Sequence, residues 1–313
     1  MSSSELYDRA SDWLLRSYPT IASGLLPSAG LPECRALAER VLDIQRTKAG
    51  DEQALERGLE AFARISFDFI RLQARFARRG AYASREAKSI IDSLYLNPER
   101  MEGYYLDGLL LTYAFWPNHA LMLRFFAEEF LPSVSEGASF LEIGVGHGLM
   151  AYLALSANLT TGYTAYDISP SSLEYARDLL IRNGIDARRF DLIRGDATQM
   201  NGSHRPVGQS HHAVICCEVL EHVERPEEIL ATIRDRLRPG GLAYVTTVAN
   251  VEAEDHIFLF RDADHIRETL IAAGLVVDRE LVLPLSGMES RTPLPLNYAA
   301  ILEKPSQGAQ SGD

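Results

Sequence analysis

Positive charge is scarce in this sequence. Of its 313 residues, 31 are Lys or Arg and 43 are Asp or Glu, so the formal net charge is −12 at pH 7. A protein that binds nucleic acid over a broad surface carries the opposite charge, because its basic side chains must neutralise phosphates. We therefore expect no nucleic-acid partner, and the overall field also disfavours an anionic membrane surface.

Long apolar runs and cysteines are scarce as well. No segment approaches the roughly 20 consecutive apolar residues of a membrane-spanning helix, and the first residues lack the basic and apolar regions of an export signal. Cys34, Cys216 and Cys217 are an odd set without the spacing of a disulfide framework. These absences predict a cytoplasmic protein with reduced thiols and no membrane partner.

Apolar side chains, in contrast, make up 46% of the sequence, which excludes disorder as the main state. Up to about residue 135 the pattern is helical, and over residues 52–78 Leu, Ile and Phe recur every three or four residues. We interpret residues 1–135 as a helical domain. Its apolar faces would pack within the chain or against a second copy in a homodimer.

Residues 136–304 alternate short apolar runs with amphipathic segments, which is typical of a mostly parallel sheet covered by helices on both faces. The last two runs have no helix between them and are expected to pair antiparallel. A mobile loop is expected over residues 199–210 and a disordered tail over residues 305–313. Seven runs are predicted to be strands: residues 139–143, 163–166, 190–194, 213–217, 242–248, 276–283 and 298–303.

The most informative segment is a glycine-rich turn after the first predicted strand. It reads F-L-E-I-G-V-G-H-G and places Glu142 ahead of Gly144, Gly146 and Gly148. Glycines at such a turn allow a ligand to approach backbone N–H groups. A dinucleotide loop would have glycine where this chain has Leu149, and the Gly-Lys-Ser/Thr of a phosphate loop is absent. Because Glu142 would repel a pyrophosphate, the turn suits a ligand with positive charge.

Acidic residues stand at the ends of the next predicted strands. Asp167 ends the second strand, Asp196 follows the third and Glu218 follows the fourth. Ligands of open α/β sheets bind beyond the carboxyl ends of the strands, and an acid at the end of the second strand commonly binds ribose hydroxyls. Together with the glycine turn, these acids indicate a site for a cationic nucleoside without phosphates.

In five segments the sequence resembles the class I S-adenosylmethionine-dependent methyltransferases, in the order and spacing of that family. The resemblance implies a Rossmann-like α/β fold with a seven-stranded, mostly parallel sheet that has one antiparallel strand, preceded here by the α-helical N-terminal domain. Residues 136–304 would form the S-adenosylmethionine-binding domain. The matching segments are LEIGVGHG (141–148), YDIS (166–169), GDA (195–197), CCEVLEHV (216–223) and LRPGG (237–241).

The resemblance also implies how the cofactor is held. The glycine turn would hold its amino-acid end, the acid after the second strand its ribose, and the GDA segment its adenine. Glu218 would lie near the sulfonium and the acceptor. His147 departs from the family, in which many relatives have a small or polar residue there. The implied cofactor-binding residues are Glu142, Gly144, Gly146, Gly148, Asp167, Ile168, Asp196, Ala197 and Glu218.

The segment E-V-L-E-H could also turn two carboxylates and an imidazole toward one point. It resembles the E-x-x-E-H segment of metal-using methyltransferases of small-RNA 2′-hydroxyls, which a later histidine joins, and a related segment of the ubiquinone-pathway O-methyltransferases. This likeness implies a Mg²⁺, Mn²⁺ or Fe²⁺ site made by Glu218, Glu221, His222 and His256. The alternative is that no metal binds, and that Glu221 and His222 make hydrogen bonds within their own loop.

The candidate catalytic residues are His222, His256, His119 and Glu218. A histidine suits proton removal from a nucleophile because its ordinary pKa lies near neutrality. His265 is a further candidate for a base that works without a metal.

An aromatic segment precedes the first predicted strand. In small-molecule methyltransferases such an N-terminal section often forms a lid over the substrate, so the helical domain could be a cap that excludes water and stabilises a cation. The alternative is that these rings are the packed core of the helices. They are Tyr104, Tyr105, Tyr113, Phe115 and Trp116.

We therefore expect an S-adenosylmethionine-dependent methyltransferase that acts on a small-molecule acceptor, a specialised metabolite. In-line transfer would be assisted by a histidine or a metal, and proximity would supply much of the acceleration. Two alternatives stay open. One is an enzyme of the same fold that uses the cofactor for cyclisation or catalyses a substrate rearrangement, and the other is a non-catalytic cofactor-binding subunit.

Overall fold

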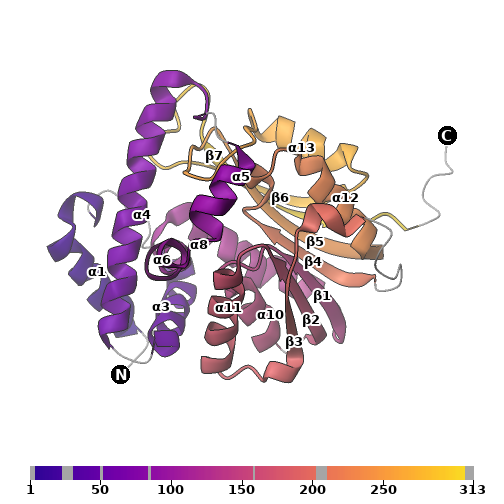
Figure 1. Cartoon of the computed structure of the whole chain (residues 1–313), viewed down its shortest axis with the longest axis horizontal. Helices are drawn as coiled ribbons and strands as arrows, with labels where there is room; N and C mark the ends of the chain where they lie inside the picture. The colour runs from indigo at the N-terminus through magenta and orange to yellow at the C-terminus, as the bar shows by residue number, and fades with distance from the viewer. Residues whose placement is uncertain are drawn as a thin grey trace.

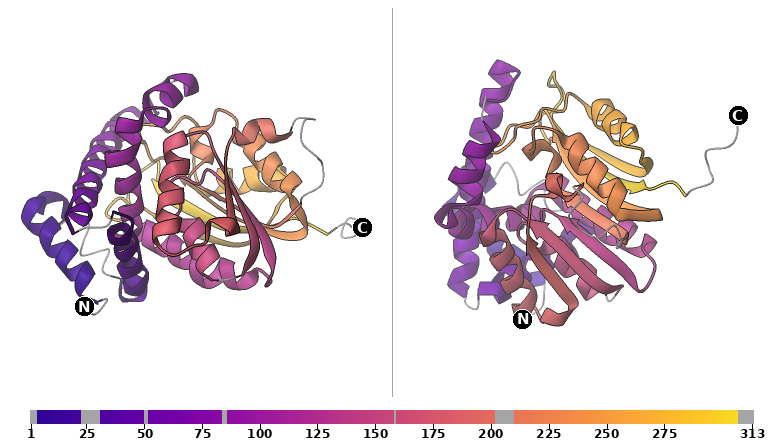
Figure 2. Two further views of the ribbon diagram at one scale, coloured as in Figure 1. Left: turned by 60° about the horizontal axis from the view of Figure 1, so that its bottom comes forward. Right: turned by 45° about the vertical axis from the view of Figure 1, so that its right-hand side comes forward.

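The computed structural model describes residues 4–22, 31–49, 52–83, 86–157, 159–201 and 210–306. Helices form the N-terminal part of the chain, and the long helix α4 (Glu52–Arg79) stands beside the part that contains the sheet (Figures 1 and 2). Most of the expected mobile loop and disordered tail, at residues 202–209 and 307–313, lies outside the described residues. Among the described helices, none is both long and apolar enough to cross a membrane.

Within the described residues, seven strands form one sheet in the order β3-β2-β1-β4-β5-β7-β6. The first five strands pair in parallel, whereas β7 is antiparallel to both β5 and β6. The predicted fold class, a mostly parallel sheet with one antiparallel strand and N-terminal helices, is confirmed. The strands are β1 (Ala138–Ile143), β2 (Thr160–Asp167), β3 (Phe190–Arg194), β4 (His211–Cys217), β5 (Leu237–Ala249), β6 (Val276–Pro284) and β7 (Leu296–Glu303).

The helices follow the strands as the alternating pattern predicted. In α11, for example, the Ser169 hydroxyl accepts a hydrogen bond from Ser172 N–H at 3.3 Å and so begins the helix. The longer helices are α1 (Ser4–Ser17), α3 (Arg35–Ala49), α4, α7 (Leu106–Phe115), α8 (Pro117–Phe125), α10 (Leu149–Ser156), α11 (Pro170–Arg182), α12 (Pro226–Arg236) and α13 (Ala263–Ala272). The short helical turns are η1 (Pro32–Cys34), α5 (Ala87–Ile90), η2 (Ile91–Tyr95), α6 (Pro98–Arg100), η3 (Met101–Tyr105), η4 (Phe126–Phe130), α9 (Leu131–Ser133), η5 (Ala187–Arg189), η6 (Ala197–Asn201) and η7 (Leu220–His222).

Two local predictions were wrong. The fifth strand begins at Leu237 and not after the Pro-Gly-Gly turn, because Gly240 and Gly241 exchange backbone hydrogen bonds with Lys304 at 2.8 and 3.0 Å. Residues 199–201 belong to η6, whose start is fixed by the Asp196 carboxylate accepting from Thr198 N–H at 2.9 Å.

Helix α4 owes its position to an apolar face. Leu59, Phe62 and Phe76 are buried along it, whereas Phe67 on the opposite side is exposed. Gly108 of α7 lies against α4 so closely that a Cβ there would come within 2.4 Å of Ile65 Cδ1. Each buried Leu or Phe stabilises the fold by roughly 1.5–3 kcal/mol. The packing of α4 against α7 therefore holds the N-terminal helices together.

A polar cluster joins the helical part to the sheet part. The carboxylate of Asp107 in α7 accepts from Gln45 Nε2 at 2.9 Å, from Lys48 Nζ at 3.3 Å and from the Tyr175 hydroxyl at 2.6 Å. Gln45 and Lys48 belong to α3, and Tyr175 belongs to α11, which packs on the sheet. One carboxylate thus links three helices.

We expect Asp107→Ala to lower the free energy of unfolding by about 2–3 kcal/mol, because it leaves three donors without their acceptor in a partly buried place. Urea unfolding followed by circular dichroism measures this change. Asp43→Ala is the matched control: Asp43 pairs with Arg46 on the surface, so its loss should cost less than about 1 kcal/mol. Equal losses in the two variants would contradict the role given to Asp107.

Candidate active site

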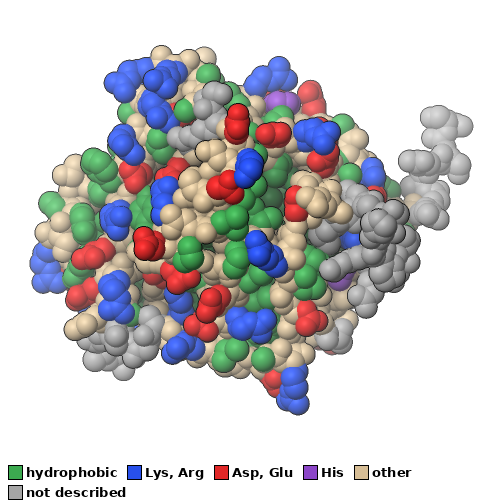
Figure 3. All heavy atoms as spheres, viewed as in Figure 1, with side chains coloured by type: hydrophobic (Ala, Val, Ile, Leu, Met, Phe, Trp, Pro, Cys, Tyr) green, Lys and Arg blue, Asp and Glu red, His purple; other side chains and the backbone are tan. Residues whose placement is uncertain are grey.

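A cavity of about 880 Å³ lies at the carboxyl ends of the parallel strands, between them and the N-terminal helices. Its walls include the glycine turn, the strand-end acids and side chains of α4 and α7. Figure 3 shows apolar side chains reaching the surface near the middle of the viewed face, among acidic and basic ones. The volume is within the range of small-molecule sites.

The glycine turn needs glycine for two different reasons. Gly144, Gly146 and Gly148 all have positive φ, at 76°, 50° and 79°. A Cβ on Gly144 would lie 2.6 Å from Val219 Cγ2, and one on Gly148 would lie 2.9 Å from Ala176 Cβ. A Cβ on Gly146 would meet nothing within 4 Å. Gly146 therefore faces open space in the cavity, where a ligand can approach the backbone.

Gly148 does not line the cavity, unlike the other predicted cofactor-binding residues. It precedes α10 and allows that helix to approach α11 at Ala176. Its part in the site is to shape the turn.

Asp167 is held at the rim of the cavity by backbone donors. Its Oδ2 accepts from Gly146 N–H at 3.0 Å, and its Oδ1 accepts from Ser169 N–H at 2.8 Å. Burial raises the pKa of Asp167 to about 6, although these hydrogen bonds oppose the shift. Asp167 thus ties the glycine turn to the end of β2.

Glu142 lies deeper, at the end of β1. Its carboxylate is buried and accepts from the Tyr163 hydroxyl at 2.7 Å. Burial raises the pKa of Glu142 to about 8, against the effect of that hydrogen bond. A positively charged ligand would remove the penalty on the ionised form.

Asp196 and Ala197, which follow β3, also line the cavity. The Asp196 carboxylate accepts from the Thr198 hydroxyl at 2.7 Å and from Gln199 Nε2 at 3.0 Å. The first part of the predicted mobile loop is therefore ordered by the same acid that was predicted to contact the adenine.

Two acids follow β4, of which Glu218 is partly exposed and Glu221 is buried. Glu218 has a φ of 53°, which is unusual for a residue with a side chain. Its backbone N–H donates to the Thr246 hydroxyl oxygen at 3.1 Å. Glu221 is fully buried and accepts from the Thr247 hydroxyl at 2.8 Å. Oε1 of each carboxylate is buried and has no hydrogen-bond partner among the residues that the structure describes. Burial and the nearby Glu221 carboxylate raise the pKa of Glu218 well above its usual range.

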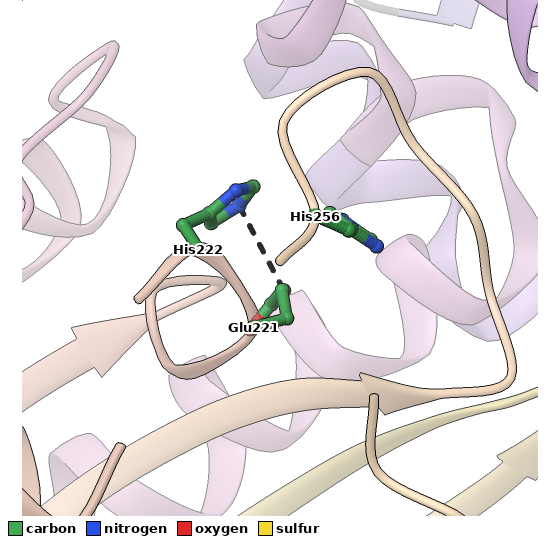
Figure 4. Close-up of side chains that lie close together, drawn as sticks. All are labelled: Glu221, His222 and His256. Atoms are coloured by element: carbon green, nitrogen blue, oxygen red, sulfur yellow. Dashed lines mark ion pairs between the residues drawn. The ribbon is translucent and has the colours of Figure 1, made fainter. Parts of the chain in front are cut away.

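Three of the four predicted metal ligands come together. One ligand atom from each of Glu221, His222 and His256 lies within 4.8 Å of the others, whereas Glu218 is outside this group. Figure 4 shows Glu221 and His222 on one turn and His256 on a separate loop. His256 Nδ1 lies 2.7 Å from the Val251 carbonyl and must donate to it, which leaves Nε2 available.

The surroundings of the two histidines in this group shift their pKa values in opposite directions. Although burial alone disfavours a charged ring, the carboxylates of Asp255 and Glu221 raise the pKa of His222 above its ordinary value. Burial, with His222 nearby, lowers the pKa of His256. A proton or a cation at His222 therefore keeps its neighbour neutral, with a lone pair for binding or for accepting a proton.

The other candidate bases lie elsewhere. His119 lines the cavity but its Nδ1 contacts the Thr112 hydroxyl at 2.7 Å, and burial with the nearby His147 lowers its pKa to about 3. His147 accepts from Leu149 N–H at 3.2 Å, and burial lowers its pKa to about 4. His265 belongs to α13 and does not line the cavity.

Of the five aromatic residues that could belong to a lid or to the helical core, one is in the core and four line the cavity. Phe115 is fully buried in the helical core. Four rings of the segment line the cavity: Tyr104, Tyr105, Tyr113 and Trp116.

Tyr95 was not predicted from the sequence, but it lines the cavity beside His222, with its hydroxyl 3.3 Å from His222 Nδ1. Nor was a role predicted for Asp255, whose carboxylate accepts from the Tyr95 hydroxyl at 2.7 Å. The only available signal was that Asp255 precedes His256 in the chain.

Known proteins match part of this chain. Residues 141–243 match the family model of a methyltransferase domain. The chain is 31% identical over 113 residues to the mitochondrial ubiquinone biosynthesis O-methyltransferase of Schizosaccharomyces pombe, covering 36% of this chain and 39% of that protein. It is 30% identical over 141 residues to the ubiquinone biosynthesis O-methyltransferase of Xanthomonas axonopodis pv. citri, covering 44% and 54%. The matches thus span between 39% and 54% of these relatives' length.

A solved structure shares the fold. Phosphoethanolamine N-methyltransferase 2 of Haemonchus contortus, in complex with S-adenosyl-L-methionine, superposes with a TM-score of 0.52 at 15% identity, covering 72% of this chain and 61% of that chain. The sheet order, the matched domain and the relatives agree with the resemblance drawn from the glycine turn and the strand-end acids. These findings support a class I S-adenosylmethionine-dependent methyltransferase domain, with the family model matching residues 141–243.

Proposed function

We propose that this protein transfers a methyl group from S-adenosylmethionine to a hydroxyl oxygen of a small metabolite with apolar surface. The observation that carries the proposal is a single cavity bordered by the glycine turn, by Asp167 and by His222. It combines donors and acceptors for a nucleoside with a group that can take a proton. The relatives named above are O-methyltransferases, which supports oxygen as the acceptor atom.

The chain's own residues would bind the cofactor as follows. The Asp167 carboxylate can accept from ribose hydroxyls, Asp196 and Ala197 can border the adenine, and Glu142 can pair with the amino group. When bound, S-adenosylmethionine supplies an electrophilic methyl group. The remaining wall of the cavity orients the acceptor toward it.

That wall is mostly apolar and comes largely from the N-terminal helices before β1, which we call the helical cap. Phe69 and Leu72 of α4 and Ile91 of η2 line it, with Met288 from the loop between β6 and β7. Such a surface binds an apolar body and keeps water from the reacting atoms. His222 or His256 can accept the hydroxyl proton at its Nε2 as the acceptor oxygen reacts.

The residues also fit a divalent metal. Glu221 Oε1 is buried, finds no hydrogen-bond partner in the described part of the chain, and lies 4.0 Å from His222 Nε2. A carboxylate with two imidazoles suits Mn²⁺ or Fe²⁺ well and can hold Mg²⁺. Glu221, His222 and His256 would hold the ion, and it would acidify and orient the hydroxyl. A cytoplasmic location, a homodimer and the absence of a nucleic-acid partner stay predictions.

Asp167→Ala should weaken S-adenosylmethionine binding by about tenfold or more, roughly 1.4 kcal/mol, because ribose hydroxyls lose a charged acceptor. Calorimetric titration of metal-free protein measures the affinity. Asp186→Ala is the matched control, since Asp186 also accepts from a backbone N–H, of Arg188, but at the surface and outside the cavity. An equal affinity in Asp167→Ala and wild type would contradict the assignment.

Binding of the cofactor at pH 7 should release up to about one proton from Glu142. With its pKa raised to about 8 by burial, Glu142 is mostly protonated in the free protein, and a cationic amino group beside it favours the ionised form. The release should fade toward about pH 9, where the carboxylate is already ionised. Calorimetry in two buffers of different ionisation enthalpy measures the number of protons. Glu142→Gln should abolish the release, and a buffer-independent enthalpy in the wild type would refute this reading.

The test of the function itself is product analysis. The protein is incubated with S-adenosylmethionine carrying a labelled methyl group and with a panel of apolar phenols and alcohols, with and without Mg²⁺ or Mn²⁺. We expect a labelled methyl ether and an equal amount of S-adenosylhomocysteine. Methylthioadenosine as the product, or an altered acceptor with the cofactor intact, would instead favour cofactor cyclisation or a substrate rearrangement.

A further inference from the structure

The loop over residues 250–257, which follows β5, is hydrogen-bonded to the helical cap along its length. Gln73 of α4 donates to the Asn250 carbonyl at 3.0 Å and accepts from Glu252 N–H at 3.2 Å. Arg75 of α4 forms an ion pair with the buried Glu252 carboxylate. The same loop carries His256 and lies against His222. The cap therefore determines where this loop sits.

Two further hydrogen bonds from the cap meet at one carboxylate, that of Asp255. Asp255 is buried, and its Oδ2 accepts from the Tyr95 hydroxyl at 2.7 Å and from the Tyr105 hydroxyl. Both tyrosines belong to the cap. The His222 ring and the two tyrosine hydroxyls stabilise the Asp255 carboxylate, so its pKa is lowered even though burial alone would raise it.

Asp255 in turn contacts His222. The Nδ1 atom of His222 lies 3.1 Å from the Asp255 carbonyl oxygen and 3.4 Å from its carboxylate Oδ2. Both atoms can only accept, and the Tyr95 hydroxyl has already given its hydrogen to Asp255. Nδ1 must therefore carry a hydrogen and donate it. This leaves Nε2 as the atom that faces Glu221, at 4.0 Å.

The backbone that presents the two tyrosines is irregular. Tyr95 is the last residue of the π-helical turn η2, and Tyr105 is the last residue of the π-helical turn η3. Glu102, inside the second turn, has a ψ of −121°, which is not helical. π-turns are rare, are less stable than α-helix and occur frequently at functional sites. Here they bring both hydroxyls to the same carboxylate.

We propose that Tyr95 and Tyr105 are positioning residues for His222, and that they act through Asp255, so that the helical cap completes the active site as well as covering it. The proposal rests on the proposed function insofar as His222 binds a metal or accepts a proton there. It concerns the placement of the ring and not its titration.

The test compares Tyr95→Phe/Tyr105→Phe with wild type by NMR of protein labelled with ¹⁵N at histidine, in metal-free buffer at one pH. The two ring-nitrogen signals of His222, assigned by their loss in His222→Gln, should shift and broaden in the double variant. Tyr298→Phe is the matched control, because Tyr298 also donates to a carboxylate, that of Glu280, away from the cavity. It should leave the His222 signals where they are.

A second readout is the split of kinetic constants. With an acceptor identified, kcat of the double variant should fall by about tenfold or more, since misplacement of a reacting group by roughly 1 Å can cost up to about 100-fold. The calorimetric affinity for S-adenosylmethionine should stay within about twofold, because neither tyrosine holds the cofactor. If the double variant fails to fold, Tyr95→Phe alone is measured in the same way.

Unchanged His222 signals in a folded variant would overturn the proposal. Failure of the proposed function would look different: wild type would bind no S-adenosylmethionine, whatever the His222 signals do. Shifted signals with intact cofactor binding support both statements.

Discussion

The burial of carboxylates at one edge of the sheet is the constraint on which the rest of this structure depends. Glu142 and Glu221 are buried away from water, and Glu218 and Asp167 are only partly exposed beside them. An ionised carboxylate in such a place is costly unless donors, protons or a cation compensate it. The parallel direction of β1, β2 and β4 brings the strand ends together, and the turns after them supply backbone N–H groups.

The carboxylates differ in how many hydrogen bonds they receive, and this difference indicates what each of them can bind. Asp167 receives two backbone hydrogen bonds, whereas Glu218 and Glu221 each keep one buried oxygen without a partner. A protein tolerates such atoms where a ligand or an ion will meet them. The well-satisfied acid therefore suits recognition of hydroxyls, and the under-satisfied pair suits a cationic centre near the reacting atoms.

In the proposed function, the helical cap supports this chemistry because α4, η2 and η3 form the cavity wall opposite the strand ends. Without α4 and the turns η2 and η3, the acids would face water, and their attraction to a cation would be screened. Two carboxylates help to join the cap to the sheet part: Asp107 joins it to α11, and Asp255 joins it to the loop that carries His256. Both contacts are hydrogen bonds to carboxylates, so directional hydrogen bonds as well as apolar packing hold the two parts of the chain together.

Local rules predicted the elements of the sheet part, because strand and helix periods and glycine turns are written in neighbouring residues. The acids after β2, β3 and β4 could be placed at one edge for the same reason. Contacts between distant residues could not be predicted: Arg75 meets Glu252 across 177 positions, and Tyr95 meets Asp255 across 160. The place of Gly148 outside the cavity wall could not be predicted either, because a glycine beside a ligand and a glycine beside a neighbouring helix look the same in sequence.

The most direct test of the account is the ligand preference of the cavity. Equilibrium dialysis of the wild-type protein with S-adenosylmethionine and, separately, with a dinucleotide such as NAD compares a cationic ligand with a pyrophosphate. The account predicts micromolar binding of S-adenosylmethionine, about −8 kcal/mol, and no measurable binding of the dinucleotide, because the turn has Leu149 where a pyrophosphate-binding loop has glycine. Binding of the dinucleotide with equal or greater affinity would contradict it.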